Sequence, residues 1–229
     1  MPDSSSIARS STAALGVRVD VSLFTPRGAE LAVLLLSPPA VRGRRRWLLP
    51  SDALRVDEPL DAAAARIARD ALGGVPSFLD QSRAHGGARR AAGLPQIGVA
   101  YFGLTPDAGV SKRNAAWIGL SNLPPLAPRL KEEIDAALMT LRGHVDRLPI
   151  AFRLLPSAFT LSDLQSVYEL LLGRRLHKAS FRRSLHAAAL VEATDEWRSE
   201  GRGRPAQLFR YAPPRRRRLR RGVRFDLLT

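Results

Sequence analysis

Cysteine is absent from the 229 residues, which excludes disulfide frameworks, cysteine-ligated zinc, iron–sulfur clusters and thiol nucleophiles. The four histidines, His85, His144, His177 and His186, show neither the spacing nor the neighbouring carboxylates of a metal site, so we expect no metal and no cofactor. Long apolar runs are also lacking. The longest, residues 31–36, is far shorter than the roughly 20 residues of a membrane-spanning helix. No signal peptide is evident either, and we expect a cytoplasmic protein without a membrane partner.

Basic residues, in contrast, are in excess and unevenly placed. The formal net charge is +15, from 36 Lys+Arg and 21 Asp+Glu. Residues 1–150 hold 19 basic and 14 acidic groups (+5), whereas residues 151–229 hold 17 and 7 (+10). Such a charge favours a polyanion such as DNA, although solvated charge without a partner is the alternative. The C-terminal third is therefore the end expected to face nucleic acid.

The first part of the chain mixes strands and helices. Alternating apolar residues predict a strand over 17–23, the run 31–36 predicts its neighbour, and alternation returns over 97–101. Helical spacing predicts helices over 60–71 and 130–141, ended by Gly73 and Gly143. The segments between them, 82–95 and 105–115, are rich in polar residues or glycine and are expected to be loops. This pattern predicts an α/β sandwich.

The C-terminal part has the order helix, turn, helix and hairpin. Thr160 and Asp163 form a capping box before an apolar helix that Gly173 ends. We expect Ser180 to cap a second helix, and a strand pair to follow around a Gly/Arg turn. These elements predict a winged helix-turn-helix. Arg182 and Arg183 on the outer face of the second helix could then reach guanine edges in the major groove.

A degraded Nudix box lies in the first part. The family pattern is G, five residues, E, seven residues, then R-E-apolar-x-E-E-x-G. Here Glu58, Arg66 and Gly73 match, whereas Asp52 replaces the first Gly and Ile67, Asp70 and Ala71 replace the helix glutamates. Magnesium catalysis needs several carboxylates on one helix face, so Asp70 alone predicts negligible hydrolysis. We interpret Arg66 and Glu58 as a structural pair, with a ligand-binding role as the alternative.

Residues 16–212 together resemble the Nudix-related transcriptional regulators, the NrtR-like family. The C-terminal match is the most specific: FTLSDLQ at 159–165, VYE at 167–169, SFRR at 180–183 and GRPA at 203–206. The resemblance implies an α/β fold in which a Nudix-like α/β/α sandwich precedes a winged helix-turn-helix domain. It also implies a homodimeric repressor whose Nudix-like domain binds an ADP-ribose-type nucleotide and thereby releases operators of NAD-metabolism or sugar-catabolism genes.

These expectations divide the chain into five segments. They are a disordered leader 1–15, a Nudix-like sensor domain 16–143, a linker 144–157, a DNA-binding domain 158–212 and an Arg-rich tail 213–229. Residues expected to contact double-stranded DNA are Ser180, Arg182, Arg183, His186, Arg202 and Arg204. Residues expected to contact the small nucleotide effector are Arg44, Arg46, Trp47, Arg89, Arg90 and Tyr101.

The function predicted from the sequence is a sequence-specific DNA-binding regulator with a noncatalytic sensor domain. Two alternatives remain at this point. One is a Nudix hydrolase of nucleoside diphosphate derivatives with an appended nucleic-acid module, and the other is an architectural or interaction protein without a ligand.

Overall fold

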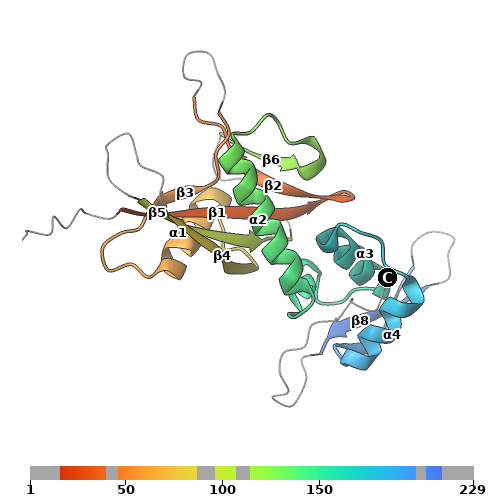
Figure 1. Ribbon diagram of the computed structural model, residues 1–229. Helices are drawn as coiled ribbons and strands as arrows, with labels where there is room; N and C mark the ends of the chain where they lie inside the picture. Colours follow the sequence, from red (N-terminus) through yellow and green to blue (C-terminus); the bar gives the residue numbers. More distant parts are fainter. Residues whose placement is uncertain (1–15, 40–45, 87–95, 107–113, 200–204, 213–229) are drawn as a thin grey trace, which may run out of the picture.

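The computed structural model describes residues 16–39, 46–86, 96–106, 114–199 and 205–212 (Figure 1). Several of the sequence predictions fall outside these ranges. They are the leader 1–15, the tail 213–229 and five of the expected contact residues, Arg44, Arg89, Arg90, Arg202 and Arg204.

The first part of the chain builds a mixed sheet of six strands in the order β4-β5-β1-β2-β6, with β3 paired to β1. Strands β1 and β5 run parallel, and the other pairs are antiparallel. The three predicted strands are confirmed as β1, β2 and β5. The strands are β1 (Gly16–Arg27), β2 (Glu30–Leu36), β3 (Ser51–Ala53), β4 (Phe78–Gly86), β5 (Gln96–Leu104) and β6 (Ala115–Gly119).

Helix α1 (Leu60–Leu72) covers one face of the sheet, as the sequence predicts. Its buried face is made of small residues and Ile67, which pack with Val19, Val21 and Leu23 of β1. Gly73 ends the helix with a left-handed φ of 78°, a conformation that glycine adopts without steric cost. Alternation along β1 therefore directs Asp20 and Phe24 to the opposite face.

Helix α2 (Pro128–Val145) covers that opposite face and is longer than predicted. Gly143 does not end it: the helix continues for two residues, to Val145. Glycine within a helix costs about 1 kcal/mol relative to alanine. Here Leu141 and Val145, one helical turn apart, are both fully buried in the same core, and that burial outweighs the cost.

The predicted loop 82–95 is wrong over its first five residues, which belong to strand β4, and β6 was not predicted at all. Both strands are edges of the sheet. Most of their described residues are only half-buried, so the alternation that marks a half-buried inner strand is weak in both. In β4 the register also shifts between Gln81 and Arg83, which disrupts the period of two further.

The second part is the predicted winged helix-turn-helix. Thr160 and Asp163 form the expected capping box of α3, which Gly173 ends in a left-handed conformation. Helix α4 begins at Lys178, with His177 as its N-cap, so the expected cap at Ser180 is wrong and Ser180 lies inside the first turn. The elements are η2 (Ile150–Leu154), α3 (Leu161–Leu172), α4 (Lys178–Ala188), β7 (Val191–Arg198) and β8 (Ala206–Tyr211).

One hydrophobic core runs from the α2 face of the sheet into the winged helix. It joins Phe24 and Leu141 to Tyr168 of α3 and Phe181 of α4. The segment expected to be a linker, 144–157, contributes to this core, because four of the five residues of η2 are buried. Helix α2 ends beside α3 and contacts it (Figure 1), so the two parts of the chain are packed together.

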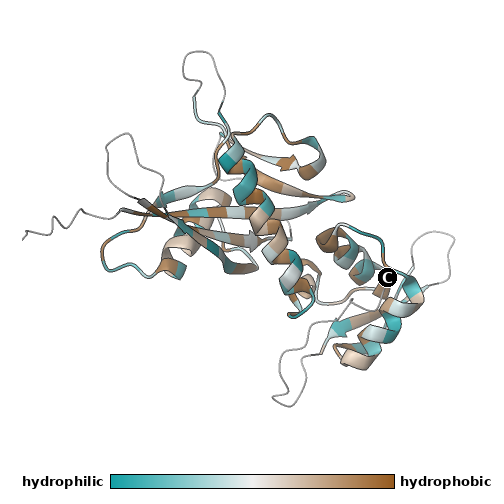
Figure 2. Cartoon of the chain, in the orientation of Figure 1, coloured by the Kyte–Doolittle hydropathy of each residue, from teal (hydrophilic) through white to brown (hydrophobic). Residues whose placement is uncertain are grey.

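Hydropathy follows this arrangement. In Figure 2 brown segments run along the strands of the sheet between white and teal ones, and α1, α2 and α4 each carry teal segments. Among the described helices, none combines the length and apolar content needed to cross a membrane.

Candidate functional site: a basic helix and a pocket joined by α2

Helix α4 presents basic side chains to solvent. Phe181 and Leu185 are fully buried and fix the inner face of the helix. Arg182, Arg183 and His186 are exposed on its outer face, as the sequence predicts. Because a helix of this diameter fits the major groove of B-DNA, this face has the shape and charge of a recognition helix.

Two features of α4 were missed from the sequence. Lys178 and His177 are both exposed at its start, so the basic surface begins three residues before the expected cap. Ser180 is half-buried, and its hydroxyl lies 3.3 Å from His177 Nδ1, so its contact is local. The exposed position of Lys178 follows from the helix start, which no capping signal in the sequence marks.

Glu169 fixes the turn between α3 and α4. Its Oε1 accepts bonds from the backbone N–H of Leu176 at 2.9 Å and from Gln165 Nε2 at 2.9 Å, and its Oε2 accepts from Arg175 Nη1 at 3.0 Å. Burial opposes the charged form, but these bonds outweigh it and lower the pKa of Glu169 below its ordinary value. A single half-buried carboxylate therefore holds together the turn that leads into α4.

The antiparallel pair of β7 and β8 forms the wing. An ion pair attaches it to α3. Arg198 at the end of β7 donates to Asp163 Oδ2 at 2.6 Å, and Asp163 is also the capping residue of α3. The backbones of Phe159 and Phe209 bond to one another across the base of the wing. The hairpin is thus held in a fixed position relative to the two helices. The expected contacts Arg202 and Arg204 lie outside the described residues.

On the α1 side of the sheet, residues of the predicted Nudix box form an ion-pair network. Arg66 donates through Nε and Nη2 to both oxygens of Glu58, at 2.8 and 2.9 Å, and through Nη1 to Asp52 at 2.7 Å. The predicted structural pair of Glu58 and Arg66 is therefore present, and Asp52, which replaces the first glycine of the box, joins it. These groups close the loop 52–58 onto α1.

The same helix lacks the carboxylates that hold magnesium in Nudix enzymes. Ile67 and Ala71 occupy two of the glutamate positions and are buried against the sheet. Asp70 occupies the third and is exposed. Among the described residues, the one group of three ligand-type side chains close enough to share an ion lies elsewhere, on the α2 face. The residues of α1 do not fit a magnesium site.

The Arg66 network predicts a specific dependence of stability on pH. The bonds from Arg66 lower the pKa of Glu58 to about 2, from an ordinary value of 4.5. Because the folded-state pKa is depressed, the stabilisation is fully present above pH 4.5 and is lost as the pH falls toward 2. We expect the stability difference between the native chain and Glu58→Gln, measured by urea unfolding, to be larger at pH 7 than at pH 3.

Glu132→Gln is the matched control, since Glu132 is an exposed carboxylate on α2. Its stability difference should change little over the same range. An equal difference for Glu58→Gln at the two pH values would contradict the assignment.

A pocket of about 340 Å³ opens on the α2 face, between β1, the segment after residue 45 and the start of α2. We call it the α2 pocket. The groups around it that can recognise a ligand are Arg18, Asp20, Arg46, Trp47, Arg129 and Glu133. Of the residues expected to contact an effector, the structure therefore brings Arg46 and Trp47 to one pocket, and it adds Arg18 and Arg129, which the sequence analysis missed.

Tyr101 does not join them. It lies 2% exposed on the α1 side of the sheet, and its hydroxyl donates to Asp61 at 2.6 Å. Burial and the Asp61 carboxylate raise the pKa of Tyr101 above its ordinary value. The alternation of β5 explains the difference: neighbouring Phe102 faces α2, so Tyr101 must face α1.

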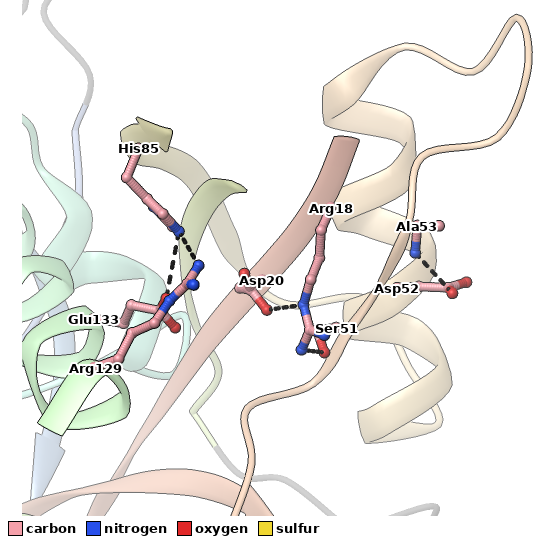
Figure 3. A network of polar contacts seen from close by, with 8 residues as sticks. All are labelled: Arg18, Asp20, Ser51, Asp52, Ala53, His85, Arg129 and Glu133. Carbon is pink, nitrogen blue, oxygen red and sulfur yellow. Dashed lines mark hydrogen bonds and ion pairs between the residues drawn. The ribbon is translucent and has the colours of Figure 1, made fainter. Parts of the chain in front are cut away.

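A polar network lies along one side of the α2 pocket (Figure 3). Arg18 Nε donates to Asp20 Oδ1 at 2.8 Å, and its Nη2 bonds Ser51. Arg129 Nε donates to Glu133 Oε1 at 3.1 Å. His85 of β4 points into the same network, although its spacing in the sequence gives it no carboxylate neighbour. Only the pairing of strands and the packing of α2 bring the three elements together.

Comparisons with known proteins agree with this architecture. Residues 151–211 match the model of the NrtR DNA-binding winged helix domain. The ADPR responsive transcriptional repressor NtrR of Acinetobacter baylyi is 29% identical over 203 residues, covering 85% of this chain and 81% of its own.

Two solved structures share the fold over most of the chain. Shewanella oneidensis NrtR, complexed with a 27mer DNA, superposes with a TM-score of 0.70 at 28% identity, over 86% of this chain and 93% of its own. A MutT/nudix family protein from Enterococcus faecalis superposes with a TM-score of 0.69 at 16% identity, over 87% and 89%, and shows the fold alone.

The fold and these likenesses define a class of protein in which a Nudix-like α/β domain is followed by a DNA-binding winged helix. Within that class the chain is similar to NrtR proteins, and the resemblance predicted from the sequence is confirmed.

Proposed function

We propose that the chain is a sequence-specific DNA-binding repressor whose Nudix-like domain senses an ADP-ribose-type nucleotide. The observation that carries the proposal is the recognition helix: Arg182 and Arg183 project from a helix whose inner face is anchored by buried Phe181. The Shewanella relative was crystallised with DNA, and the Acinetobacter relative is named as responsive to ADPR. Both likenesses extend over more than four-fifths of this chain.

On the DNA side, α4 would lie in the major groove. Arginine recognises guanine through two parallel hydrogen bonds, and each such pair contributes about 1–3 kcal/mol of discrimination. Lys178 and His177, at the start of the same helix, are placed for phosphate contacts, which position a protein without specifying sequence. The basic C-terminal third of the chain adds attraction that depends on salt.

On the effector side, we assign the nucleotide to the α2 pocket. Its volume is at the lower end of the range for small-molecule sites. Guanidinium groups of Arg18, Arg46 and Arg129 can bind a diphosphate through charge-assisted hydrogen bonds, and Trp47 offers an indole ring for stacking. The remaining expected contacts, Arg44, Arg89 and Arg90, lie outside the described residues.

Helix α2 connects the two sites. Arg129 and Glu133 near its start belong to the α2 pocket, whereas Leu141 and Val145 near its end lie in the core shared with α3. Eighteen helical residues span about 27 Å as a rigid element. A ligand that shifts the start of α2 would therefore also shift the core surface against which α3 and α4 pack. In a homodimer this would change the spacing of the two recognition helices.

We propose that the Nudix-like domain is noncatalytic, because Ile67 and Ala71 provide no ligands where hydrolysis needs carboxylates. Because the proposed target is DNA, we also propose that the protein acts in the cytoplasm. A turnover assay with ADP-ribose or NADH and Mg²⁺ or Mn²⁺ tests the first point. We expect no turnover, and turnover abolished by Asp70→Ala would instead establish a hydrolase.

Selection of bound genomic fragments tests the function as a whole. The purified chain is incubated with fragmented DNA, with and without ADP-ribose, and the bound fragments are sequenced. We expect a small set of fragments with one shared motif, depleted when ADP-ribose is present. Retention of all sequences alike would indicate a nonspecific architectural protein, which should also show no thermal shift with nucleotides.

A further inference from the structure

Three side chains from three separate elements meet on the α2 face of the sheet. They are Asp20 of β1, His85 of β4 and Glu133 of α2, and their ligand atoms all lie within 4.8 Å of one another. Figure 3 shows the His85 ring and the Glu133 carboxylate directed toward each other, and Asp20 reaches them from β1, which β5 separates from β4. Asp20 is 4% exposed and Glu133 is 6% exposed. Two nearly buried carboxylates need cationic partners, which Arg18 and Arg129 provide in this structure.

The histidine offers a lone pair to this cluster. Arg129 Nη2 lies 2.6 Å from His85 Nε2, and a guanidinium group can only donate. His85 Nε2 therefore accepts this bond, and a metal ion would take the same lone pair once Arg129 moves away. Neutral imidazole in this form is the state that binds a metal ion. The ion pair of His85 with Glu133, which would need a protonated ring, is incompatible with this bond.

Two arginines neutralise the charges of Asp20 and Glu133, and both arginine side chains can move away from the cluster. Arg18 bonds Asp20 and Arg129 bonds Glu133, but their side chains are 36% and 50% exposed at the edge of the α2 pocket. Long, half-exposed arginine side chains can move into solvent at small energetic cost. The cluster can thus exchange its two guanidinium groups for one divalent ion without unfolding any element.

The separation of the His85 and Glu133 donor atoms suits such an ion. His85 Nε2 and Glu133 Oε1 are 3.5 Å apart. Two ligands of a tetrahedral zinc ion, with bonds of about 2.0–2.1 Å, are about 3.3 Å apart. Gly98, directly opposite His85 on β5, leaves the space in which the ring lies, because a Cβ at that position would overlap the imidazole. The backbone therefore already holds the ring beside Glu133.

We propose that Asp20, His85 and Glu133 form a binding site for a divalent transition metal ion of the zinc class. These three residues supply the protein ligands, and the fourth position opens to the α2 pocket, which Asp20 and Glu133 also line. The ion ties the start of α2 to two strands of the sheet. The site stands on side-chain geometry alone and does not depend on the proposed regulatory function.

Titration of the full-length chain with Co²⁺, a spectroscopic substitute for Zn²⁺, tests the proposal. The absence of cysteine removes thiolate sites from the background. We expect an intense visible absorption from a four-coordinate cobalt ion, which Zn²⁺ displaces. His85→Gln and Glu133→Gln should each weaken Co²⁺ binding by at least about tenfold, because each removes a direct ligand. Circular dichroism spectra identify any variant that fails to fold.

Two further variants sharpen the test. His186→Gln is the matched control, since it removes an exposed histidine of α4, and it should leave the titration unchanged. Arg129→Ala removes the competing cation and should tighten Co²⁺ binding. Gly98→Ala displaces the His85 ring without removing a ligand and should weaken binding. Absence of the visible band in the native chain, or its persistence in His85→Gln and Gly98→Ala, would overturn the proposal.

Discussion

Phe181→Ala is expected to lower the free energy of unfolding by about 3–5 kcal/mol, the range observed when a buried phenylalanine is truncated. Phe181 is fully buried, and its ring contacts Tyr168 edge-on with the centroids 5.5 Å apart. This contact packs α4 against α3. The loss approaches the whole stability of a marginal domain, so urea unfolding should show an early transition of the winged helix.

Trp197→Ala provides the control for this prediction. Trp197 is an aromatic residue of the same domain, but it is 57% exposed on β7. Its truncation should change stability by only about 0.5 kcal/mol. If the two variants unfolded at similar urea concentrations, the packing of α4 described above would be wrong.

Arg183→Ala is expected to weaken operator binding by about 5- to 150-fold and to relax the preference at one base position. The reason is the loss of a bidentate contact with a guanine edge, which contributes about 1–3 kcal/mol of discrimination. Binding to unrelated DNA should change much less, because phosphate contacts remain. Fluorescence anisotropy with operator and scrambled duplexes, followed by selection from a randomised operator, measures both effects.

Arg69→Ala removes the same charge from an exposed position on α1, outside the winged helix. It should alter operator and scrambled binding equally and only slightly. Equal losses on both duplexes for Arg183→Ala would show instead that Arg183 contacts phosphate.

Local signals in the sequence predicted most of the elements well. The capping box of Thr160 and Asp163 and the left-handed Gly173 are set by neighbouring residues, so the bounds of α3 followed directly. The small-residue face of α1 likewise predicted its burial. The strands β4 and β6 did not follow, because edge strands have two half-exposed faces and weak alternation. The predicted end of α2 at Gly143 was wrong, because burial of Leu141 and Val145 in the core outweighs the low helix propensity of glycine.

The site residues differ in the same way: those set by local pattern were predicted, and those set by long-range pairing were not. Arg182 and Arg183 follow from helical periodicity, and the pairing of Glu58 with Arg66 follows from the spacing of the Nudix box. The Asp20, His85 and Glu133 cluster depends on the pairing of β4 with β5 and on the register of β1, which are long-range properties. Tyr101 was assigned to the effector because alternation alone does not say which face of a sheet carries the ligand.

The central claim is that a nucleotide bound at the α2 pocket changes the affinity of α4 for DNA. The most direct test is the operator dissociation constant of the full chain with and without saturating ADP-ribose, with binding of the nucleotide confirmed by thermal shift. A coupling free energy of about 1–3 kcal/mol predicts a 5- to 150-fold weaker complex in its presence. An unchanged dissociation constant with ADP-ribose bound would contradict the account.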